Sequence, residues 1–343
     1  MKALVKTIKG AGGVVYQDMP DPGTPPPGMI LVEVKTVGIC GSDIHVFHGT
    51  FMHVPPVIMG HEYVGVVVEV GAGVTRFKKG DKVSSEVATE YCGKCFFCRS
   101  GDIQQCIDRK GMGATRHGCF AHYALVQENV THLLPDNVDY TLGALVEPVS
   151  TCSHCIEQTG IEGKDTVVVA GPGPIGLINM QLAKAEGAFV IVTGTSVDEE
   201  RLKLAKELGA DLTINVQTED GLKIIKDVTN GYGSDVFLEC SGNARSIALG
   251  IEAVRCQGKY TQMGVIGSDV TINLDRLANK EIKLTGVKAG KYSSWERAIN
   301  YVQRGKVNLK KIATHEFGLD KWEDAFKVFE SKQGLKILMH PVD

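Results

Sequence analysis

The segment 166–186 constrains the fold of this chain more than any other stretch. Its apolar run at residues 166–170 is typical of a short buried strand, and the turn Gly171-Pro-Gly-Pro-Ile-Gly176 follows at once. Residues 175–186 then have the periodicity of a helix. A strand, a glycine-rich turn and a helix in this order begin a βαβ unit, whose strands lie parallel in one sheet. The spacing therefore predicts a parallel sheet in this half of the chain.

The alternation of strands and helices continues after this turn. We expect strands at residues 189–193, 211–215, 236–239 and 258–263, and a helix at 199–208. Two helices, at 294–303 and 321–331, and a last strand at 336–340 complete the chain. Strands that alternate with helices predict an α/β fold with a doubly wound parallel sheet.

The first 150 residues have a different character. Strands are predicted at residues 1–8, 29–37 and 63–70, so this part is β-rich. A length of 343 residues suits two domains. We place a β-rich domain at 1–152 and the α/β domain at 153–289, and we expect residues 290–343 to return to the first domain.

Composition excludes several classes of function. The net charge of −3 argues against a nucleic-acid or anionic-membrane surface as partner. No apolar run approaches the ~20 residues of a membrane helix, and the N-terminus lacks the pattern of a signal peptide. We therefore expect a cytoplasmic protein that binds neither nucleic acid nor membrane. Its ten cysteines should stay reduced there, so that clustered cysteines suggest a metal site.

Four cysteines form such a cluster. Cys92, Cys95, Cys98 and Cys106 have the spacing C-x2-C-x2-C-x7-C. Four thiolates complete a tetrahedral zinc site and leave no position open for water or substrate. The spacing therefore predicts a structural zinc ion.

The other cysteines carry weaker signals. Cys152 and Cys155 repeat the C-x2-C spacing, but no second pair lies near them in the sequence. Buried free thiols are the favoured interpretation of this pair. Cys119, Cys240 and Cys256 are isolated, and we expect them to be core thiols.

A second metal site is predicted from residues that lie far apart in the chain. Cys40 opens Cys-Gly-Ser42-Asp-Ile-His45, Gly-His61-Glu62 follows, and Glu147 interrupts an apolar run. A catalytic zinc takes three ligands from Cys, His and carboxylate and keeps one position open. Cys40, His61 and Glu147 could form this set, with Glu62 beside it. Each residue alone has an ordinary structural explanation, and their combination favours the metal.

The glycine-rich turn predicts where a nucleotide binds. Gly171 permits the tight turn, Gly173 lets the backbone approach a pyrophosphate, and Gly176 lets the helix pack against the strand. Pro174 and Ile175 begin the helix, whose N-terminus attracts the phosphates. The strand–turn–helix context makes this motif specific for a dinucleotide.

Taken together, these motifs resemble the zinc-containing medium-chain dehydrogenase/reductase family over essentially the whole chain. Cys-Gly-Ser-Asp-x-His, Gly-His-Glu-x-x-Gly, the cysteine loop and Gly-x-Gly-x-x-Gly occur in the family's order. The resemblance implies a GroES-like catalytic domain and a Rossmann cofactor domain. Glu147-Pro148 is similar to the polyol (sorbitol) and threonine dehydrogenase branch, where ordinary alcohol dehydrogenases tend to have Cys.

The resemblance also implies roles for the site residues. Cys40, His61 and Glu147 would be ligands of a catalytic zinc, and Glu62 would either ligate it or hold its water. Ser42 and His45 would pass the substrate proton to solvent; a turn hydroxyl and a solvated loop histidine are the alternatives. Two zinc ions per chain are expected, and relatives form homodimers or homotetramers.

The cofactor is expected to be NAD or NADP. NAD-binding sheets normally end their second strand with Asp or Glu, which binds the ribose. Here Gly-Thr195-Ser196 stands at that place, and the acid is absent or displaced to Asp198. These small residues leave room for a 2′-phosphate that Arg201 could neutralise, so NADP is slightly favoured, although Arg201 could equally be an exposed helix charge. Val265, after the strand at 258–263, is also expected at the cofactor.

The substrate remains open between several candidates. We expect oxidation of a secondary hydroxyl of a polyol to a ketone, with L-threonine 3-dehydrogenase as the alternative. A non-catalytic redox or metal-binding protein is the alternative of another class. Sorbitol dehydrogenases tend to have an Arg-Tyr pair where this chain has Val287-Lys288-Ala289. Lys288 could bind an acidic or phosphorylated substrate, or be a surface lysine.

Overall fold

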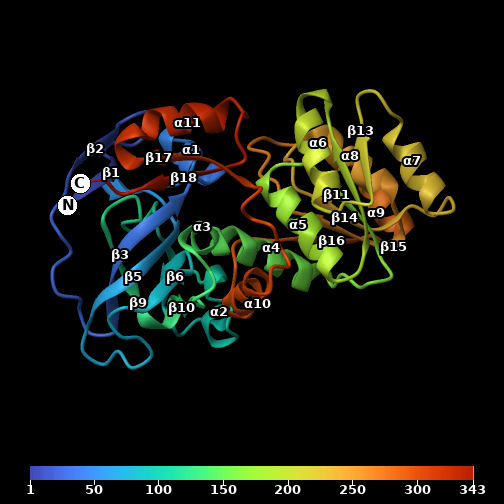
Figure 1. The fold of residues 1–343 in the computed structure, drawn as a ribbon. Coiled ribbons are helices and arrows are strands. Elements are labelled where there is room, and N and C mark those ends of the chain that lie inside the picture. Colours follow the sequence, from blue (N-terminus) through green and yellow to red (C-terminus); the bar gives the residue numbers. More distant parts are fainter. Residues whose placement is uncertain (343) are drawn as a thin grey trace. The chain divides into compact units, whose positions relative to one another are not determined.

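The computed structural model describes residues 1–342, which form two compact units (Figure 1). The first unit contains Met1–Ser150, Ala289–Arg304 and the chain from Leu309 onward. The second contains Thr151–Lys288 and Gly305–Asn308. The first unit is therefore built from both ends of the chain.

The first unit is dominated by a seven-stranded sheet with the order β10-β6-β5-β3-β18-β17, in which β9 also pairs with β3. Two smaller sheets, β2-β1-β4 and β7-β8, accompany it. The strands are β1 (Lys2–Lys6), β2 (Val14–Asp18), β3 (Met29–Gly38), β4 (Val57–Ile58), β5 (Glu62–Val70), β6 (Lys82–Ser85), β7 (Ala88–Glu90), β8 (Lys110–Gly111), β9 (Tyr123–Gln127), β10 (Thr131–Leu133), β17 (Ala313–Gly318) and β18 (Lys336–His340).

The helices of this unit are short. They are α1 (Gly41–Phe47), α2 (Phe96–Arg99), α3 (Tyr140–Ala144), α10 (Tyr292–Gln303) and α11 (Trp322–Glu330), with 3-10 turns η1 (Ile103–Gln105), η2 (Glu128–Val130) and η4 (Leu319–Lys321). A further helix, α4 (Val146–Thr159), begins in the first unit and ends in the second. Strands β3 and β18 contribute Val37 and Met339 to the buried core, so the returning tail is part of that core.

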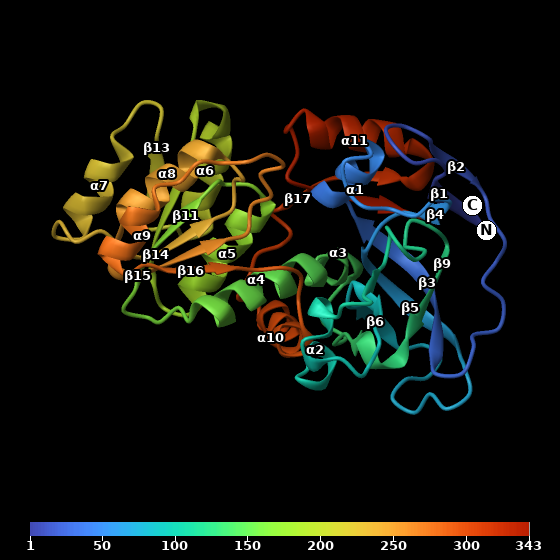
Figure 2. The ribbon, with the colours of Figure 1, turned by 180° about the vertical axis from the view of Figure 1, so that it is seen from behind.

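The second unit is a six-stranded sheet in which every pair is parallel. Its strands are β11 (Thr166–Ala170), β12 (Phe189–Gly194), β13 (Leu212–Asn215), β14 (Ser234–Glu239), β15 (Val254–Gln262) and β16 (Lys283–Gly286). Its helices are α5 (Pro174–Ala185), α6 (Glu199–Glu207), α7 (Gly221–Val228), α8 (Ala244–Ala253) and α9 (Leu274–Lys280), with one 3-10 turn, η3 (Ser196–Asp198). Figure 2 shows the helices beside this sheet from behind.

The strand order of this sheet is β13-β12-β11-β14-β15-β16. It is the order of the doubly wound dinucleotide-binding sheet, which confirms the predicted fold class. Residues 167–170 of β11 are all buried, as expected for a strand covered on both faces. The carboxyl ends of β11, β12, β14 and β15 meet at one edge because the strands are parallel, and this edge is where such sheets bind ligands.

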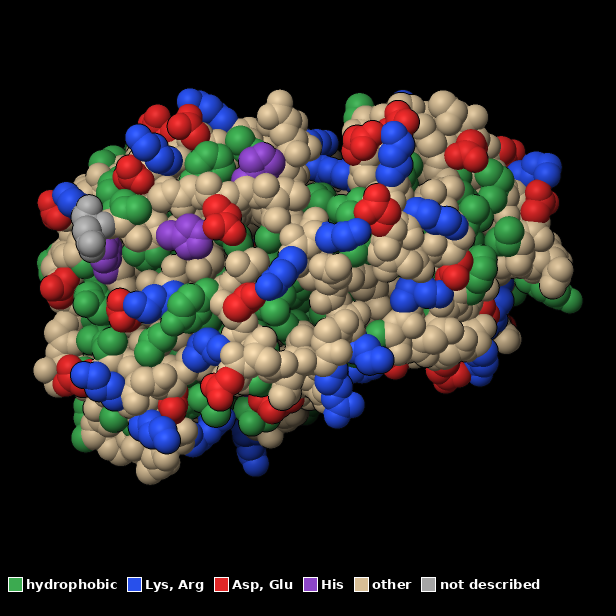
Figure 3. Space-filling model, viewed as in Figure 1, with side chains coloured by type: hydrophobic (Ala, Val, Ile, Leu, Met, Phe, Trp, Pro, Cys, Tyr) green, Lys and Arg blue, Asp and Glu red, His purple; other side chains and the backbone are tan. Residues whose placement is uncertain are grey.

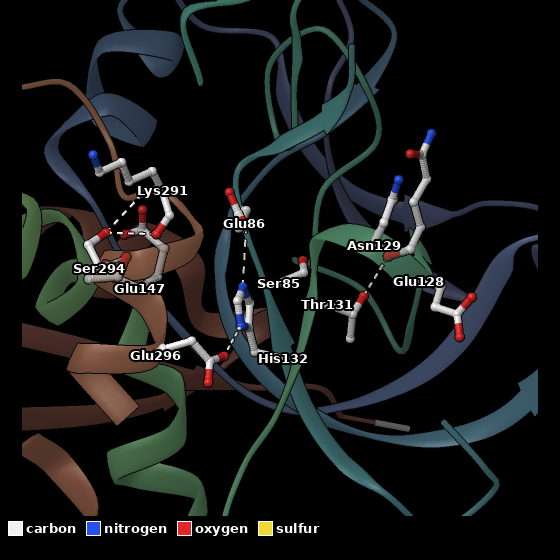
Figure 4. A network of polar contacts seen from close by, with 12 residues as sticks. Ser85, Glu86, Glu128, Asn129, Thr131, His132, Glu147, Lys291, Ser294 and Glu296 are labelled. Atoms are coloured by element: carbon white, nitrogen blue, oxygen red, sulfur yellow. Dashed lines mark hydrogen bonds and ion pairs between the residues drawn. The ribbon is translucent and has the colours of Figure 1, made fainter. Parts of the chain in front are cut away.

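A polar network around the buried ring of His132 connects α10 to the rest of the first unit (Figure 4). The ring of His132, on β10, lies between two carboxylates: Nε2 is 3.3 Å from Glu86 and Nδ1 is 3.0 Å from Glu296 on α10. The same ring stacks on Trp295, with centroids 4.9 Å apart. Both polar bonds and ring packing therefore hold the returning helix.

The expectation that Cys256 is a core thiol is wrong, whereas the other cysteines outside the metal groups are buried or partly buried. Cys152 and Cys155 are buried in α4, as expected for free thiols, and burial raises the pKa of Cys155 to about 12. Cys119 is buried and Cys240 is partly buried, but Cys256 is exposed. Cys256 lies on β15 before the positive-φ residue Gln257, where the strand register shifts and the chain leaves the core.

The surface fits the expected charge balance. Figure 3 shows acidic and basic side chains interspersed on the face in view, without a large field of one sign. Within residues 1–342, no helix is both long and apolar enough to span a bilayer.

Candidate active site and metal centres

Three potential metal ligands converge where two long strands of the first unit end. Cys40 follows β3, and His61 and Glu62 stand at the start of β5. These strands are antiparallel and Gly38 pairs with Glu62, so the two ends lie side by side. The sulfur, ring nitrogen and carboxylate oxygen of the three residues lie within 4.8 Å of one another. Ligands of one tetrahedral zinc are separated by ~3.4–3.8 Å, so this group fits the metal.

Asp43 orients two members of this group. Its carboxylate accepts a hydrogen bond of 2.9 Å from the backbone N–H of Cys40, and it lies 3.5 Å from Nδ1 of His61. A carboxylate on one ring nitrogen leaves the other nitrogen for a metal. Burial alone would lower the pKa of His61. The charge of Asp43, together with the hydrogen bonds that His61 makes with Asp43 and Cys40, raises this pKa well above its usual value.

Lys336 is the partner of Glu62. Its Nζ lies 2.5 Å from Oε2 of Glu62, contacts Oε1 as well, and donates to the carbonyl of Ile39. Burial lowers the pKa of Lys336, but the negative groups around it, Glu62 first, raise it overall. Gly38 makes room for this pair, because a Cβ at that position would overlap Oε2 of Glu62. Sequence reasoning missed both Lys336 and the role of Asp43; only the Cys-Gly-Ser-Asp motif could have indicated Asp43.

Glu147 is buried in the first turn of α4 and is not a member of the close three-residue group. It lies near enough to act electrostatically on Lys336 and on Cys119. Glu62 rather than Glu147 is therefore the glutamate that joins Cys40 and His61 in the close three-residue group.

The two predicted relay residues lie on α1. Ser42 is half-buried and His45 is exposed, and Nδ1 of His45 lies 3.1 Å from Oγ1 of Thr50. Within the described residues, no hydrogen bond joins Ser42 directly to His45. Their spacing of three residues does place both side chains on one face of the helix.

The four cysteines of the loop form a second close group. All four sulfurs lie within 4.8 Å of one another; Cys98 is 3.5 Å from Cys95 and 3.9 Å from Cys92. Sulfurs that share a tetrahedral zinc at ~2.3 Å lie ~3.8 Å apart, so the group fits the metal. A backbone hydrogen bond from Cys98 lowers the pKa of Cys95 to about 6, whereas burial and the neighbouring thiol raise the pKa of Cys98 to about 12. These hydrogen bonds favour the thiolate form of Cys95, which is the form that ligates a metal.

The predicted nucleotide turn stands at the carboxyl edge of the parallel sheet. Gly171 follows β11 with a φ of 96°, which favours glycine, and Gly173 is the N-cap of α5 with open space at its Cα. Pro174 and Ile175 form the first turn of α5, and a Cβ on Gly176 would overlap the carbonyl of Gly171. The open space above Gly173 lets a pyrophosphate approach the backbone.

The acidic residue that follows β12, Asp198, is already hydrogen-bonded. Asp198 accepts hydrogen bonds from the N–H (3.1 Å) and the hydroxyl (2.7 Å) of Thr195, so this carboxylate caps the turn. Arg201 lies 3.9 Å from the other oxygen of Asp198. Ser196 is exposed and accepts a hydrogen bond of 3.1 Å from Asn215.

Glu239 was not predicted, and it joins two loops at this edge. Its carboxylate accepts hydrogen bonds from the N–H groups of Ser241 and Gly242 (both 3.0 Å) and from Gln262 (2.8 Å). Val265, in the loop after β15, is 77% exposed, and its backbone lies beside Gly242. Lys288 is also exposed, in the segment after β16.

Two family models match the chain. Residues 26–136 match the alcohol dehydrogenase GroES-like domain, and residues 174–304 match the zinc-binding dehydrogenase domain. A sorbitol dehydrogenase of Halalkalibacterium halodurans is 42% identical over 100% of both chains. This chain belongs to the zinc-dependent alcohol dehydrogenase family. A member of this family is an oxidoreductase that acts on CH–OH groups. The two close groups, Cys40 with His61 and Glu62 and the four-cysteine loop, have the ligand types that zinc binds.

Further relatives of this alcohol dehydrogenase family differ in their substrates. A D-arabitol-phosphate dehydrogenase of Enterococcus avium is 37% identical over 99% of this chain and 97% of that protein. A solved structure from Sinorhizobium meliloti, assigned as a zinc-binding dehydrogenase and bound to NADP, superposes with a TM-score of 0.90 at 30% identity and covers 99% of both chains. Zinc and NAD(P) are therefore the cofactors of the family to which this chain belongs.

Proposed function

We propose that this chain oxidises a secondary hydroxyl of a polyol, or of a polyol phosphate, to a ketone with NAD(P) as hydride acceptor. The observation that carries this proposal is the close group of Cys40, His61 and Glu62, with Glu147 within electrostatic range of Lys336. A sulfur, an imidazole and a carboxylate are the ligand types of catalytic zinc. The similarity to a sorbitol and an arabitol-phosphate dehydrogenase supports the substrate class.

In this proposal Cys40, His61 and Glu147 would hold a catalytic zinc ion. Glu62, which is paired with Lys336, would either ligate the ion or hold its water. Zinc, when bound, supplies Lewis-acid stabilisation of the substrate oxygen at neutral pH. Asp43 fixes His61, so that one ring nitrogen stays available. Ser42 accepts the hydroxyl proton and His45, which is exposed, releases it to solvent through water.

The four-cysteine loop would hold the second zinc of each chain. Its thiols saturate a tetrahedral metal, which makes the site structural. The dinucleotide would bind at Gly171–Gly176 of the second unit, with Val265 beside it. Because Asp198 already caps its own turn, Thr195, Ser196 and Arg201 favour the 2′-phosphate of NADP over the free ribose of NAD. A homodimer or homotetramer in the cytoplasm is proposed by analogy with the family.

The experiment is a substrate panel on the zinc-loaded enzyme. Sorbitol, D-arabitol, their phosphates and L-threonine are each assayed for NADPH and NADH production. We expect turnover of at least one polyol or polyol phosphate, and loss of turnover in Cys40→Ser with an unchanged circular dichroism spectrum. Turnover of L-threonine alone would refute the proposed substrate class. If no compound of the panel is oxidised although both zinc ions are bound, the proposed function is refuted.

A further inference from the structure

Arg109 stands in a segment that is fixed at both ends. It lies three residues after Cys106, whose carbonyl accepts a hydrogen bond of 3.2 Å from the backbone N–H of Arg109. It directly precedes β8, which pairs with β7, and Met112 then donates to the carbonyl of Val87 at 3.0 Å. The cysteine loop and the small sheet thus hold the backbone around Arg109, as a binding residue requires.

Among residues 1–342, the guanidinium of Arg109 makes no hydrogen bond and no ion pair. Its Nε is buried and makes no hydrogen bond to any of residues 1–342, and no ion pair of this side chain occurs among them. Gly111 provides the space, since a Cβ there would lie only 3.3 Å from Nη1. The nearby Arg116 is different, because it is exposed and forms an ion pair with Glu90.

The same segment packs against the candidate zinc site. A Cβ on Gly113 would lie 2.6 Å from the carbonyl oxygen of Gly60, the residue before His61. The N–H of Cys119, at the end of this loop, donates to the same carbonyl at 3.0 Å. Burial lowers the pKa of Arg109, and the charge of Glu147 opposes that shift, so the guanidinium lies within electrostatic range of Glu147.

A half-buried cation without a counter-charge is costly, and proteins keep such groups where a ligand supplies the charge. Glu147 does not fill this role once it ligates zinc as proposed, because the metal then offsets its charge. The guanidinium then stays a positive group without a hydrogen bond or ion pair among residues 1–342, within electrostatic range of Glu147. Its planar set of donors matches an oxyanion with two parallel hydrogen bonds.

We propose that Arg109 determines substrate specificity by binding the phosphate of a polyol phosphate, so that the phosphorylated polyol is the preferred substrate. This inference rests on the proposed function and names its substrate. A phosphate ester brings about −1.5 to −2 charges at pH 7 and three acceptor oxygens, more than a carboxylate offers. One relative is itself named for an arabitol phosphate.

The test compares each polyol with its phosphate in the zinc-loaded wild type, Arg109→Met, Arg109→Lys and the control Arg116→Met. We expect the wild type to prefer the phosphate, and Arg109→Met to lose roughly 10- to 150-fold in kcat/KM for it, mostly through KM. The free polyol should change less than about twofold. Arg109→Lys should recover part of the loss, because it keeps the charge but not the paired donors. Arg116→Met should behave as the wild type.

Several outcomes would overturn this inference. An equal loss for polyol and polyol phosphate in Arg109→Met, with reduced zinc content, would make Arg109 a positioning residue for Glu147. If the wild type favours the free polyol, a phosphate ligand is excluded. A phosphate ligand is also excluded if Arg109→Met loses turnover of L-threonine alone. Zinc content and thermal unfolding are measured on every variant, so that a folding defect is recognised.

A binding measurement separates this inference from the proposed function. Calorimetric titration of the zinc-loaded enzyme with sorbitol 6-phosphate and with inorganic phosphate requires no turnover. Weaker binding of both in Arg109→Met than in Arg116→Met supports the anion site even if no polyol phosphate is oxidised. Equal binding by the two variants contradicts it even if the substrate panel confirms a polyol dehydrogenase.

Discussion

Lys336 and Glu62 form an ion pair in the first unit, and their side chains are only 4% and 1% exposed. The pair lies beside Cys40 and His61. The two residues are 274 positions apart in the chain. The pair joins the returning strand β18 to the start of β5, so one contact connects the C-terminal tail to the proposed zinc site. The carboxylate of Glu62 therefore belongs both to this ion pair and to the close group with Cys40 and His61.

Lys336→Met should therefore destabilise the protein strongly. Removing one partner leaves a buried carboxylate without its counter-charge, which costs about 3–5 kcal/mol of unfolding free energy. Urea unfolding of the zinc-loaded protein measures the loss. Lys321→Met removes an exposed lysine and should change stability by less than about 0.5 kcal/mol. If Lys336→Met were as stable as Lys321→Met, the buried pair would have no structural role.

Cys95→Ser should remove the structural zinc. We expect zinc content, measured by mass spectrometry, to fall by one ion per chain, and the Tm to fall by at least ~5 °C. Turnover at low temperature should survive better than in Cys40→Ser, because the loop supplies no catalytic ligand. Cys256→Ser alters an exposed thiol and should match the wild type in all three measurements. An unchanged zinc content in Cys95→Ser would argue against a four-thiolate site.

Arg201→Ala should weaken NADP binding selectively. Loss of a charged hydrogen-bond donor to the 2′-phosphate should reduce kcat/KM for NADP by about tenfold or more, with little change for NAD. Lys203→Ala is the control, since this lysine stands on the same helix and forms ion pairs with Glu199 and Glu200. Equal effects of Arg201→Ala on both cofactors would contradict a 2′-phosphate contact.

His132→Phe should destabilise the first unit even though it keeps a ring against Trp295. The substitution leaves Glu86 buried without its histidine partner, and one oxygen of Glu86 already has no hydrogen bond. We expect a loss of about 1–3 kcal/mol in chemical unfolding. Glu296→Gln alters a carboxylate that is 56% exposed and should cost less than ~1 kcal/mol. The double variant Glu86→Gln, His132→Phe should recover part of the stability; no recovery would mean that the loss comes from packing.

Local patterns predicted local structure well. The strand at 166–170, the turn at Gly171 and the last strand at 336–340 lie where the sequence placed them, because each is specified by neighbouring residues. The strand β15 begins at Val254, earlier than the expected residue 258, because its first residues contain the register shift and Gln257 in the left-handed region. A bulge of this kind has no periodic signal.

The sequence by itself determined the two features whose geometry is local: the cysteine loop and the glycine-rich turn. Within such short segments, the spacing of residues fixes which atoms can meet. Only the tertiary structure shows that Glu62 rather than Glu147 joins Cys40 and His61 in one close group, and that Lys336 pairs with Glu62. The same holds for Arg109, whose side chain has no hydrogen bond or ion pair among residues 1–342. These relationships depend on how β3, β5, β18 and the loop after Cys106 pack together, and residues that meet only through packing carry no mark in the sequence.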